Sequence, residues 1–503
     1  MQTPVKKNQE VKVTVSDLSY EGMGVAKVDG YPLFVDNALP GEEVLIHVTK
    51  ANKNYGFAFV KQFYKESPDR VAVSNRVYAQ TGIAPLQHLA YPAQLKFKQN
   101  QIEQLFKKSH LDIHVAPTLA APMQTGYRNK AQIPVREVNG QLETGFYRRR
   151  SHTLIPIEDY YIQDPAIDQT VLVVRDLLRQ YNVPAYDEAH NTGVIRHVMV
   201  RRGYYTHQTM VVLITRTRDL PHADEIVAGI TAAIPEVSSI VLNMNPDATN
   251  VILGRRSRTL YGHDYLEDQL LGSTFRISAT SFYQVNPRQT ENLYKLAVDA
   301  AGLTGKEVVI DAYSGIGTIS LTMARHAQHV YGVEVVPAAV ADARVNAEIN
   351  GIDNVTFELG KAEDVMQTWR ENGLAADVLM VDPPRKGLAG DFIDAVGVML
   401  PKKVVYVSCN PATLARDIAL LQDFGYHAEE TQPVDMFPQT THVESVTVLT
   451  RGRFVGGRSD AKTALSTVSN LELLGGGCCE TTSVDYARTG CRIGDSRSGA
   501  TGG

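Results

Sequence analysis

The chain has 503 residues, of which 44% are hydrophobic and 21% charged, and its net charge is −5. This length exceeds a single hydrophobic core, so two to four domains are expected. The acidic balance excludes a protein that coats nucleic acid indiscriminately, although local basic patches are compatible with it. Without a long apolar run or a signal peptide, the sequence predicts a cytoplasmic protein that does not bind membranes.

Residues 8–66 contain five short runs with strand character, separated by glycine and proline turns. The expected strands are 11–15, 22–28, 31–35, 43–48 and 57–63. Five strands in so short a segment predict a small β-barrel of the oligonucleotide-binding type, here with an RNA-binding role. A barrel used only for protein contacts is the alternative.

Residues 67–275 combine a helix at 93–108 with many strand-like runs, which predicts a central α+β domain. Arginines cluster here, and tyrosines lie among them at positions 127, 147, 204 and 205. Cations for phosphate beside rings for stacking are typical of proteins that grip unpaired RNA. The alternative is a solvated surface of mixed charge. The candidate RNA contacts are Arg128, Arg148, Arg149, Arg150, Arg196 and Arg201.

Residues 276–453 alternate between strand and helix, which predicts an α/β domain with a mostly parallel, doubly wound sheet. The expected strands are 308–311, 330–335, 355–359, 378–381, 403–407 and 445–449. The expected helices are 317–326, 338–350, 391–400 and 412–421. Residues 454–503 are rich in glycine, serine and threonine, and we expect a disordered tail. Cys478, Cys479 and Cys491 lie in it.

A cofactor loop follows the expected strand 308–311. Gly315 and Gly317 allow the backbone to approach a ligand at the start of the next helix. Glu334 lies 19 residues beyond Gly315, where its carboxylate can accept both hydroxyls of a ribose. Ser320 replaces the third glycine that nicotinamide dinucleotides require, whereas S-adenosylmethionine has no phosphates and does not need it. Tyr313 is expected to flank this methyl donor.

Asp382 begins the run Asp-Pro-Pro-Arg directly after the expected strand 378–381. This position is at the carboxyl edge of the sheet, where ligands bind in open α/β folds. The run resembles the motif of amino-group methyltransferases, which stack the base on the fourth residue. Arg385 occupies that place here and does not suit the role. A simple turn before two prolines is the other interpretation.

Cys409 is the only cysteine in the first 451 residues, and it lies between the expected strand 403–407 and the next helix. Asn410 could cap that helix with Pro411 in its first turn, so that the positive helix end lies near the sulfur and lowers its pKa. A thiol placed so predicts a nucleophile that forms a covalent bond to a substrate carbon.

Methylation of a pyrimidine carbon needs such a thiol. Addition of a thiolate to C6 of uracil makes C5 nucleophilic, and a base must later remove the C5 proton. Glu444 is the candidate base because it precedes an apolar strand, where burial would raise its pKa. His442 is the rival, and the spacing of the residues does not separate the two.

These motifs together resemble the RNA uracil-C5 methyltransferase family. Ser-Cys-Asn-Pro at Cys409 has Asp-Pro-Pro-Arg upstream and His-Val-Glu-Ser downstream in the family's order, and the resemblance covers residues 8–453. It implies an N-terminal TRAM barrel, a central RNA-contacting domain and a Rossmann-like methyltransferase domain that uses S-adenosylmethionine. Cys409 is then the nucleophile and Glu444 the proton acceptor. Gln284, Tyr313, Glu334 and Asp382 are implied to line the methyl-donor pocket.

The chain departs from many family members in one respect. They hold an iron–sulfur cluster with four cysteines, and thiolates are the required ligands. The matching positions here are Asn75, Thr81, Ala84 and approximately Tyr160. The sequence therefore predicts no cluster and no other metal, with packing holding this loop in place.

The barrel and the missing cluster are similar to bacterial enzymes that methylate two uridines of large-subunit ribosomal RNA, and we expect a monomer of that kind. The target base would be flipped out of folded RNA. Three alternatives are open: the same chemistry on the T-loop uridine of tRNA, a non-catalytic RNA-binding factor, and amino-group or DNA methylation through Asp382.

Overall fold

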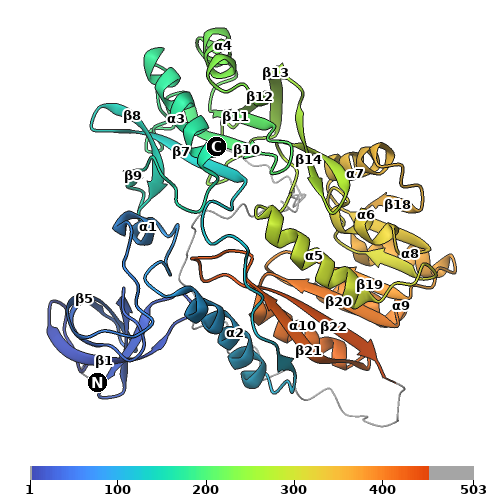
Figure 1. Ribbon diagram of the computed structural model, residues 1–503, viewed down its shortest axis with the longest axis horizontal. Helices are drawn as coiled ribbons and strands as arrows, with labels where there is room; N and C mark the ends of the chain where they lie inside the picture. Colours follow the sequence, from blue (N-terminus) through green and yellow to red (C-terminus); the bar gives the residue numbers. More distant parts are fainter. Residues whose placement is uncertain (1–2, 453–503) are drawn as a thin grey trace, which may run out of the picture.

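A computed structural model describes residues 3–452, and the expected tail 454–503 lies outside them. The described residues form a barrel, a central domain and an α/β domain, which Figure 1 shows from blue through green to red. None of the helices in this part of the chain is long and apolar enough to cross a membrane.

The N-terminal strands close into a barrel in the order β1-β2-β3-β5-β4. Alternate side chains point inward and form a closed core that includes Val13, Leu33 and Ile46. The barrel predicted from the turn spacing is therefore confirmed. Its strands are β1 (Glu10–Leu18), β2 (Gly24–Val28), β3 (Tyr31–Asp36), β4 (Glu43–Ala51) and β5 (Gly56–Lys65).

The central domain is built on a seven-stranded sheet in the order β13-β12-β11-β10-β7-β8-β9. Two helices, α3 (Pro165–Gln180) and α4 (Ala223–Ala233), pack on this sheet at the top of Figure 1. The strands are β7 (Lys130–Val138), β8 (Gln141–Tyr147), β9 (Leu154–Pro156), β10 (Ile195–Arg202), β11 (Thr209–Thr215), β12 (Val237–Met244) and β13 (Arg256–Gly262). Helix α1 (Arg76–Thr81) precedes them.

The α/β domain has an eight-stranded sheet in the order β18-β17-β16-β19-β20-β22-β21-β6. The first five of these strands are parallel, and β22 runs antiparallel to its neighbours. The strands are β6 (His114–Val115), β16 (Val308–Asp311), β17 (His329–Glu334), β18 (Val355–Leu359), β19 (Val378–Val381), β20 (Lys403–Ser408), β21 (Tyr426–Val434) and β22 (Glu444–Arg451).

Helices cover both faces of this sheet, as expected of a doubly wound fold. One apolar core joins it to α5 (Pro287–Ala301), α6 (Thr318–Ala324) and α7 (Pro337–Ile349). A second core joins the opposite face to α2 (Tyr91–Lys108), α8 (Ala362–Glu371), α9 (Gly390–Met399) and α10 (Pro411–Gln422). The hairpin of β14 (Tyr265–Leu270) and β15 (Ser273–Ser278) packs on the first core.

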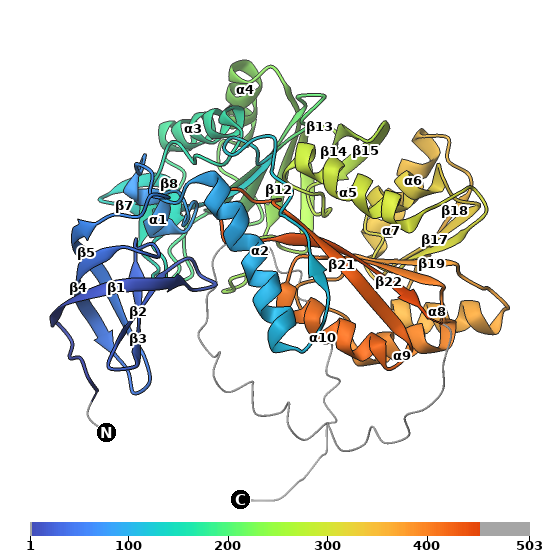
Figure 2. The same ribbon diagram turned by 60° about the horizontal axis from the view of Figure 1, so that its bottom comes forward.

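The structure differs from the sequence-based expectation in several elements, among them the helices α3, α4 and α5, which were not predicted. Helix α8 was not predicted, although its buried residues follow the helical spacing of one apolar face. Strand β21 was not predicted because two glutamates and a proline interrupt its alternation. Helix α2 lies in the range expected for the central domain, yet it packs beside α10 and β21 of the α/β domain in both views (Figure 2).

The four positions that correspond to cluster ligands are taken up by packing and capping. Asn75 caps α1, its side chain accepting a hydrogen bond from a backbone amide at 2.9 Å. Thr81, Ala84 and Tyr160 are buried, and the rings of Phe146 and Tyr160 meet edge to face at 5.3 Å. Packing thus holds this loop. Within residues 3–452, no group of three or more His, Cys, Asp or Glu side chains could hold a metal ion.

Candidate active site

Two of the predicted site residues, Asp382 and Cys409, and a further acid, Asp311, lie at the ends of adjacent parallel strands. Asp311 ends β16, Asp382 follows β19 and Cys409 follows β20. The register pairs β16 with β19 and β19 with β20, so all three residues lie at one carboxyl edge of the sheet. The sequence determines where these strands end, because each is an apolar run that stops at a polar residue.

Glu444 reaches the same edge from the other direction. Strand β22 pairs antiparallel with β20, and Ser408 lies opposite Ser445. Cys409 directly follows that pair on one chain segment and Glu444, the first residue of β22, directly precedes it on the other, so the charge of Glu444 acts on the thiol. The glutamate side chain is buried, whereas the cysteine is half-buried. The fold thus brings the candidate nucleophile and the candidate base together from residues that are 35 positions apart in the chain.

The helix after Cys409 begins as the sequence predicted. Asn410 caps α10, its side chain accepting a hydrogen bond from the Ala412 amide at 3.1 Å, and Pro411 is in the first turn. The expectation of a lowered thiol pKa is nevertheless wrong. Burial raises the pKa of Cys409, and the nearby carboxyls of Glu444 and Asp382 raise it further. These effects outweigh the opposing influence of Arg385 and of a hydrogen bond from the Cys409 backbone.

The neighbouring carboxyl groups share this environment. Burial, with a further contribution from Asp382, raises the pKa of Glu444 well above its ordinary value. Burial also raises the pKa of Asp382 to about 7, and Asp311 adds to the effect. A carboxylate with a raised pKa is a stronger base, so the site suits removal of a proton from carbon.

Replacement of Glu444 by glutamine is expected to speed alkylation of Cys409. A nearby carboxylate favours the protonated thiol, so removing that charge lowers the thiol pKa and leaves more thiolate at a given pH. The rate of iodoacetamide labelling, followed on the tryptic peptide that contains Cys409, should rise several-fold near pH 8, with its profile displaced to lower pH. Glu430→Gln, on the exposed side of β21, is the control. An unchanged profile for Glu444→Gln would contradict the assignment.

Hydrogen bonds from side chains tie the loop after β19 to α10 and its cap at this edge. The Asn410 side-chain amide donates to the carbonyl oxygen of Arg385 at 2.9 Å. The buried carboxylate of Asp417 accepts from the Leu388 amide at 2.7 Å and from the Tyr406 hydroxyl at 2.8 Å. These bonds fix the Asp-Pro-Pro-Arg loop against α10, and they place Arg385 close enough to lower the pKa of the thiol.

The turn after β16 has the shape of a ligand cradle. Gly315 and Gly317 have φ values of 54° and 87°, in the left-handed region that favours glycine. A Cβ at Gly315 would meet no atom within 4 Å, whereas one at Gly317 would come within 2.9 Å of the Phe357 ring. Glu334 lies at the end of β17. One of its carboxylate oxygens accepts hydrogen bonds from the backbone amides of residues 335 and 336. Tyr313 is half-buried beside Phe392.

Gln284 is connected to the start of α6, directly after this turn, through Tyr294, a residue that the sequence did not single out. Tyr294 of α5 is fully buried, and its hydroxyl contacts the side chains of Gln284 and Thr318. Burial raises the pKa of Tyr294, and the charges of Asp382 and Asp311 contribute. The pattern of α5 marks Tyr294 only as a core residue, so no sequence signal would have selected it.

Asp311 provides an independent test of whether the pocket suits a cationic ligand. One of its oxygens accepts from the Ser320 hydroxyl at 2.6 Å, while the other is buried and has no hydrogen-bond partner among residues 3–452. Burial raises the pKa of Asp311 to about 6. A buried carboxylate oxygen without a donor is costly. The residues present therefore fit a ligand that carries a positive charge.

The six arginines predicted to contact RNA have different surroundings. Arg196 is buried and donates to three carbonyl oxygens of residues 245–249, and Arg201 is buried and donates to the Ser281 carbonyl at 2.7 Å. Their burial contradicts the expectation that these two side chains contact RNA. Arg128 and Arg149 are partly exposed, and Arg148 and Arg150 are exposed. Arg149 and Arg150 also pair with Glu21, which lies in the turn between β1 and β2 of the barrel.

The sheet order and the residues at its carboxyl edge define an S-adenosylmethionine-dependent methyltransferase. A family model described as tRNA (uracil-5-)-methyltransferase matches residues 247–452, and a TRAM domain model matches residues 4–61. The chain is 60% identical over 450 residues to a protein of Lactiplantibacillus plantarum described as an RNA methyltransferase, covering 89% of this chain and 98% of that relative. A similarly described Enterococcus faecalis protein is 53% identical with the same coverage.

A solved structure shows the same arrangement. The Pyrococcus abyssi tRNA (uracil-54, C5)-methyltransferase in complex with S-adenosyl-L-homocysteine matches with a TM-score of 0.69 and 25% identity, covering 87% of this chain and all of that one. The chain belongs to the TRAM-containing RNA uracil-C5 methyltransferase family. It is thus an enzyme that uses S-adenosylmethionine, and the alternatives of a binding-only factor and of amino-group methylation are set aside.

Proposed function

We propose that this enzyme methylates C5 of uracil in 23S ribosomal RNA, at two uridines, through a covalent bond between Cys409 and C6. The single observation that carries the chemistry is that Cys409 and Glu444 adjoin the paired residues Ser408 and Ser445 of β20 and β22, close enough for the charges of Glu444 and Asp382 to act on the thiol. A thiol and a buried carboxyl group at one strand edge are the two groups that the reaction requires.

The reaction assigns one task to each residue. The Cys409 thiolate adds to C6, and the electrons of the C5–C6 double bond move toward C5 and O4. S-adenosylmethionine supplies the methyl group that C5 takes up. Glu444, as carboxylate, then accepts the C5 proton, the double bond re-forms, and the C6–sulfur bond breaks to return the thiolate. Gln284, Tyr313, Gly315, Gly317, Glu334 and Asp382 are proposed to bind the methyl donor.

The choice of ribosomal RNA rests on the resemblance to bacterial large-subunit enzymes that combine an N-terminal barrel with the absence of cluster cysteines. Arg128, Arg148, Arg149 and Arg150 are proposed RNA contacts, because they are at least partly exposed. The T-loop uridine of tRNA is the second candidate. It is favoured by the Pyrococcus abyssi neighbour, which acts on uracil 54 of tRNA and matches most of this chain.

Incubation with methyl donor and RNA that contains 5-fluorouridine tests the covalent step. Fluorine at C5 cannot leave as a proton, so the wild-type protein should stall as a complex that survives denaturing electrophoresis, with the bond at Cys409. Active protein that forms no such complex would overturn the covalent mechanism.

The choice of substrate is tested in the cell. After deletion of the gene, mass spectrometry of digested RNA should show loss of 5-methyluridine from two fragments of 23S RNA, with tRNA unchanged. Loss from tRNA alone would replace the ribosomal assignment by the second candidate.

A further inference from the structure

The loop 435–443 joins β21 to β22 and leads directly to Glu444. Val434, the last residue of β21, pairs with Glu444 in the antiparallel register. The loop therefore leaves the sheet next to the candidate base and returns to it at the candidate base itself.

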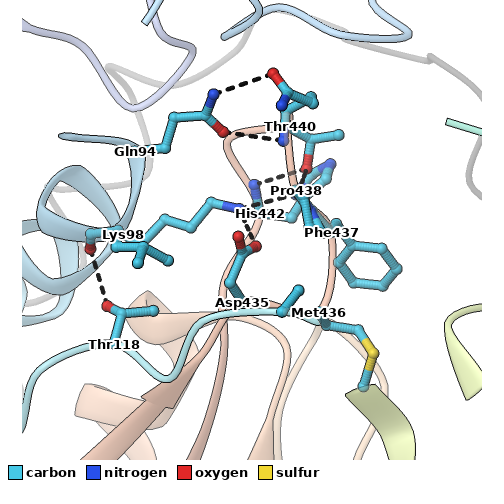
Figure 3. A network of polar contacts seen from close by, with 12 residues as sticks. Gln94, Lys98, Thr118, Asp435, Met436, Phe437, Pro438, Thr440 and His442 are labelled. Carbon is cyan, nitrogen blue, oxygen red and sulfur yellow. Dashed lines mark hydrogen bonds and ion pairs between the residues drawn. The ribbon is translucent and has the colours of Figure 1, made fainter. Parts of the chain in front are cut away.

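Helix α2 holds this loop with two buried polar side chains, shown in Figure 3. Lys98 is fully buried, forms an ion pair with Asp435 and donates to the Phe437 carbonyl at 2.9 Å. Gln94 bonds twice to Gln439, donating to its side-chain oxygen and accepting from its backbone amide, both at 3.0 Å. The two side chains lie one turn apart on α2, so one face of the helix bonds to both the first and the middle part of the loop.

Three further segments bond to the same loop. The Leu86 amide donates to residue 439 at 3.0 Å, the Tyr127 hydroxyl donates to residue 438 at 3.0 Å, and the Asn286 side chain donates to residue 436 at 2.9 Å. Tyr127 lies just before β7 of the central domain. Asn286 caps α5 and is two residues from Gln284. The loop is thus fixed from several directions by groups that have no part in the chemistry.

A buried ion pair is a poor means of gaining stability, because apolar side chains of similar volume serve as well or better. It does impose one geometry, since each charge must meet its partner to offset the loss of water. Lys98 and Asp435 are both fully buried. Asp435 directly follows Val434, the residue that pairs with Glu444. This placement fits an orienting role.

We propose that Lys98 and Gln94 are positioning residues for Glu444, which fix the loop 435–443 so that the carboxylate meets the C5 proton. The inference rests on the proposed function, in which Glu444 is the base. Loss of the contacts is expected to slow proton removal more than methyl transfer, so the methylated covalent intermediate should accumulate with ordinary uracil.

The test uses Lys98→Met and Gln94→Met in the full chain, with Glu444→Gln as the reference. Each protein is mixed with methyl donor and a 23S RNA fragment with ordinary uridine. Methyl transfer in a single turnover and the fraction of RNA in a denaturation-resistant complex are both measured. Both variants should transfer methyl within about tenfold of wild type, while the complex rises at least about tenfold above the wild-type level.

Gln99→Met is the matched control. Gln99 lies on the same helix and donates to Glu103 and to the Val115 carbonyl, away from the loop. It should give the wild-type level of complex. If the two residues only stabilise the fold, Lys98→Met and Gln94→Met would lower methyl transfer and folding stability without accumulation of the complex, which would overturn the positioning role. If Lys98→Met fails to fold because Asp435 is left unpaired, Gln94→Met leaves no buried charge and decides the question.

The outcomes separate this inference from the function beneath it. Accumulation in Glu444→Gln but not in Lys98→Met or Gln94→Met overturns the positioning role and leaves the function intact. No accumulation in Glu444→Gln, with the 5-fluorouridine complex still formed by wild type, overturns Glu444 as the base and the inference with it. Failure of wild type to form the 5-fluorouridine complex overturns the covalent mechanism itself.

Discussion

Replacement of Cys409 by alanine is expected to abolish methyl transfer, with a loss on the order of 10⁴-fold or more. Without the thiolate, C5 of uracil is too weak a nucleophile to take a methyl group. Transfer of radiolabelled methyl to a 23S RNA fragment measures the loss. The residue is half-buried at the end of β20, and its side chain is small, so the fold should persist and RNA binding should change little.

Cys478→Ala is the control, because that cysteine lies in the sequence beyond the α/β domain. It should methylate at the wild-type rate. A Cys409→Ala protein that retains activity within tenfold of wild type would exclude the cysteine as nucleophile, and the site would then need another explanation for its half-buried thiol.

Glu444→Gln is expected to lower multiple turnover by about 10² to 10⁴-fold, the range for loss of a general base. Glutamine keeps the size of the side chain but cannot accept the C5 proton, so the enzyme should complete one methyl transfer and then remain bound to its product. Burst kinetics with a plateau near one methyl group per enzyme would show this.

His442→Gln decides between the two bases that the spacing left open. His442 is more exposed than Glu444, which is buried and whose charge acts on Cys409. The His442 variant should therefore turn over repeatedly. A stalled complex in His442→Gln, with normal turnover in Glu444→Gln, would reverse the assignment.

Local patterns predicted much of the fold because each pattern depends on neighbours in the chain. The five barrel strands followed from turn residues and alternation, and the parallel strands of the α/β domain followed from apolar runs that end in polar residues. The cap at Asn410 was also readable, since its partner Ala412 is two residues away. Helix α8 could have been found by the same reasoning from its apolar spacing.

Predictions from the sequence failed where the partners of a side chain lie far away in the chain. Arg196 and Arg201 belong to arginine-rich runs, yet each is buried against carbonyl groups of distant loops. The pKa of Cys409 was expected to fall because the helix end is local, but it rises because burial and two carboxyls from other strands dominate. Tyr294 and Lys98 gave no local signal at all.

The sequence by itself determined which chemical groups are available: one thiol ahead of a capped helix, an acid after β19, an acid at the start of β22 and a glycine turn for a cofactor. Only the tertiary structure decided which of them meet and in what protonation state. The physical reason is that strand pairing sets the distances between these groups and burial sets their charge. The spacing of residues along the chain specifies neither these distances nor the burial.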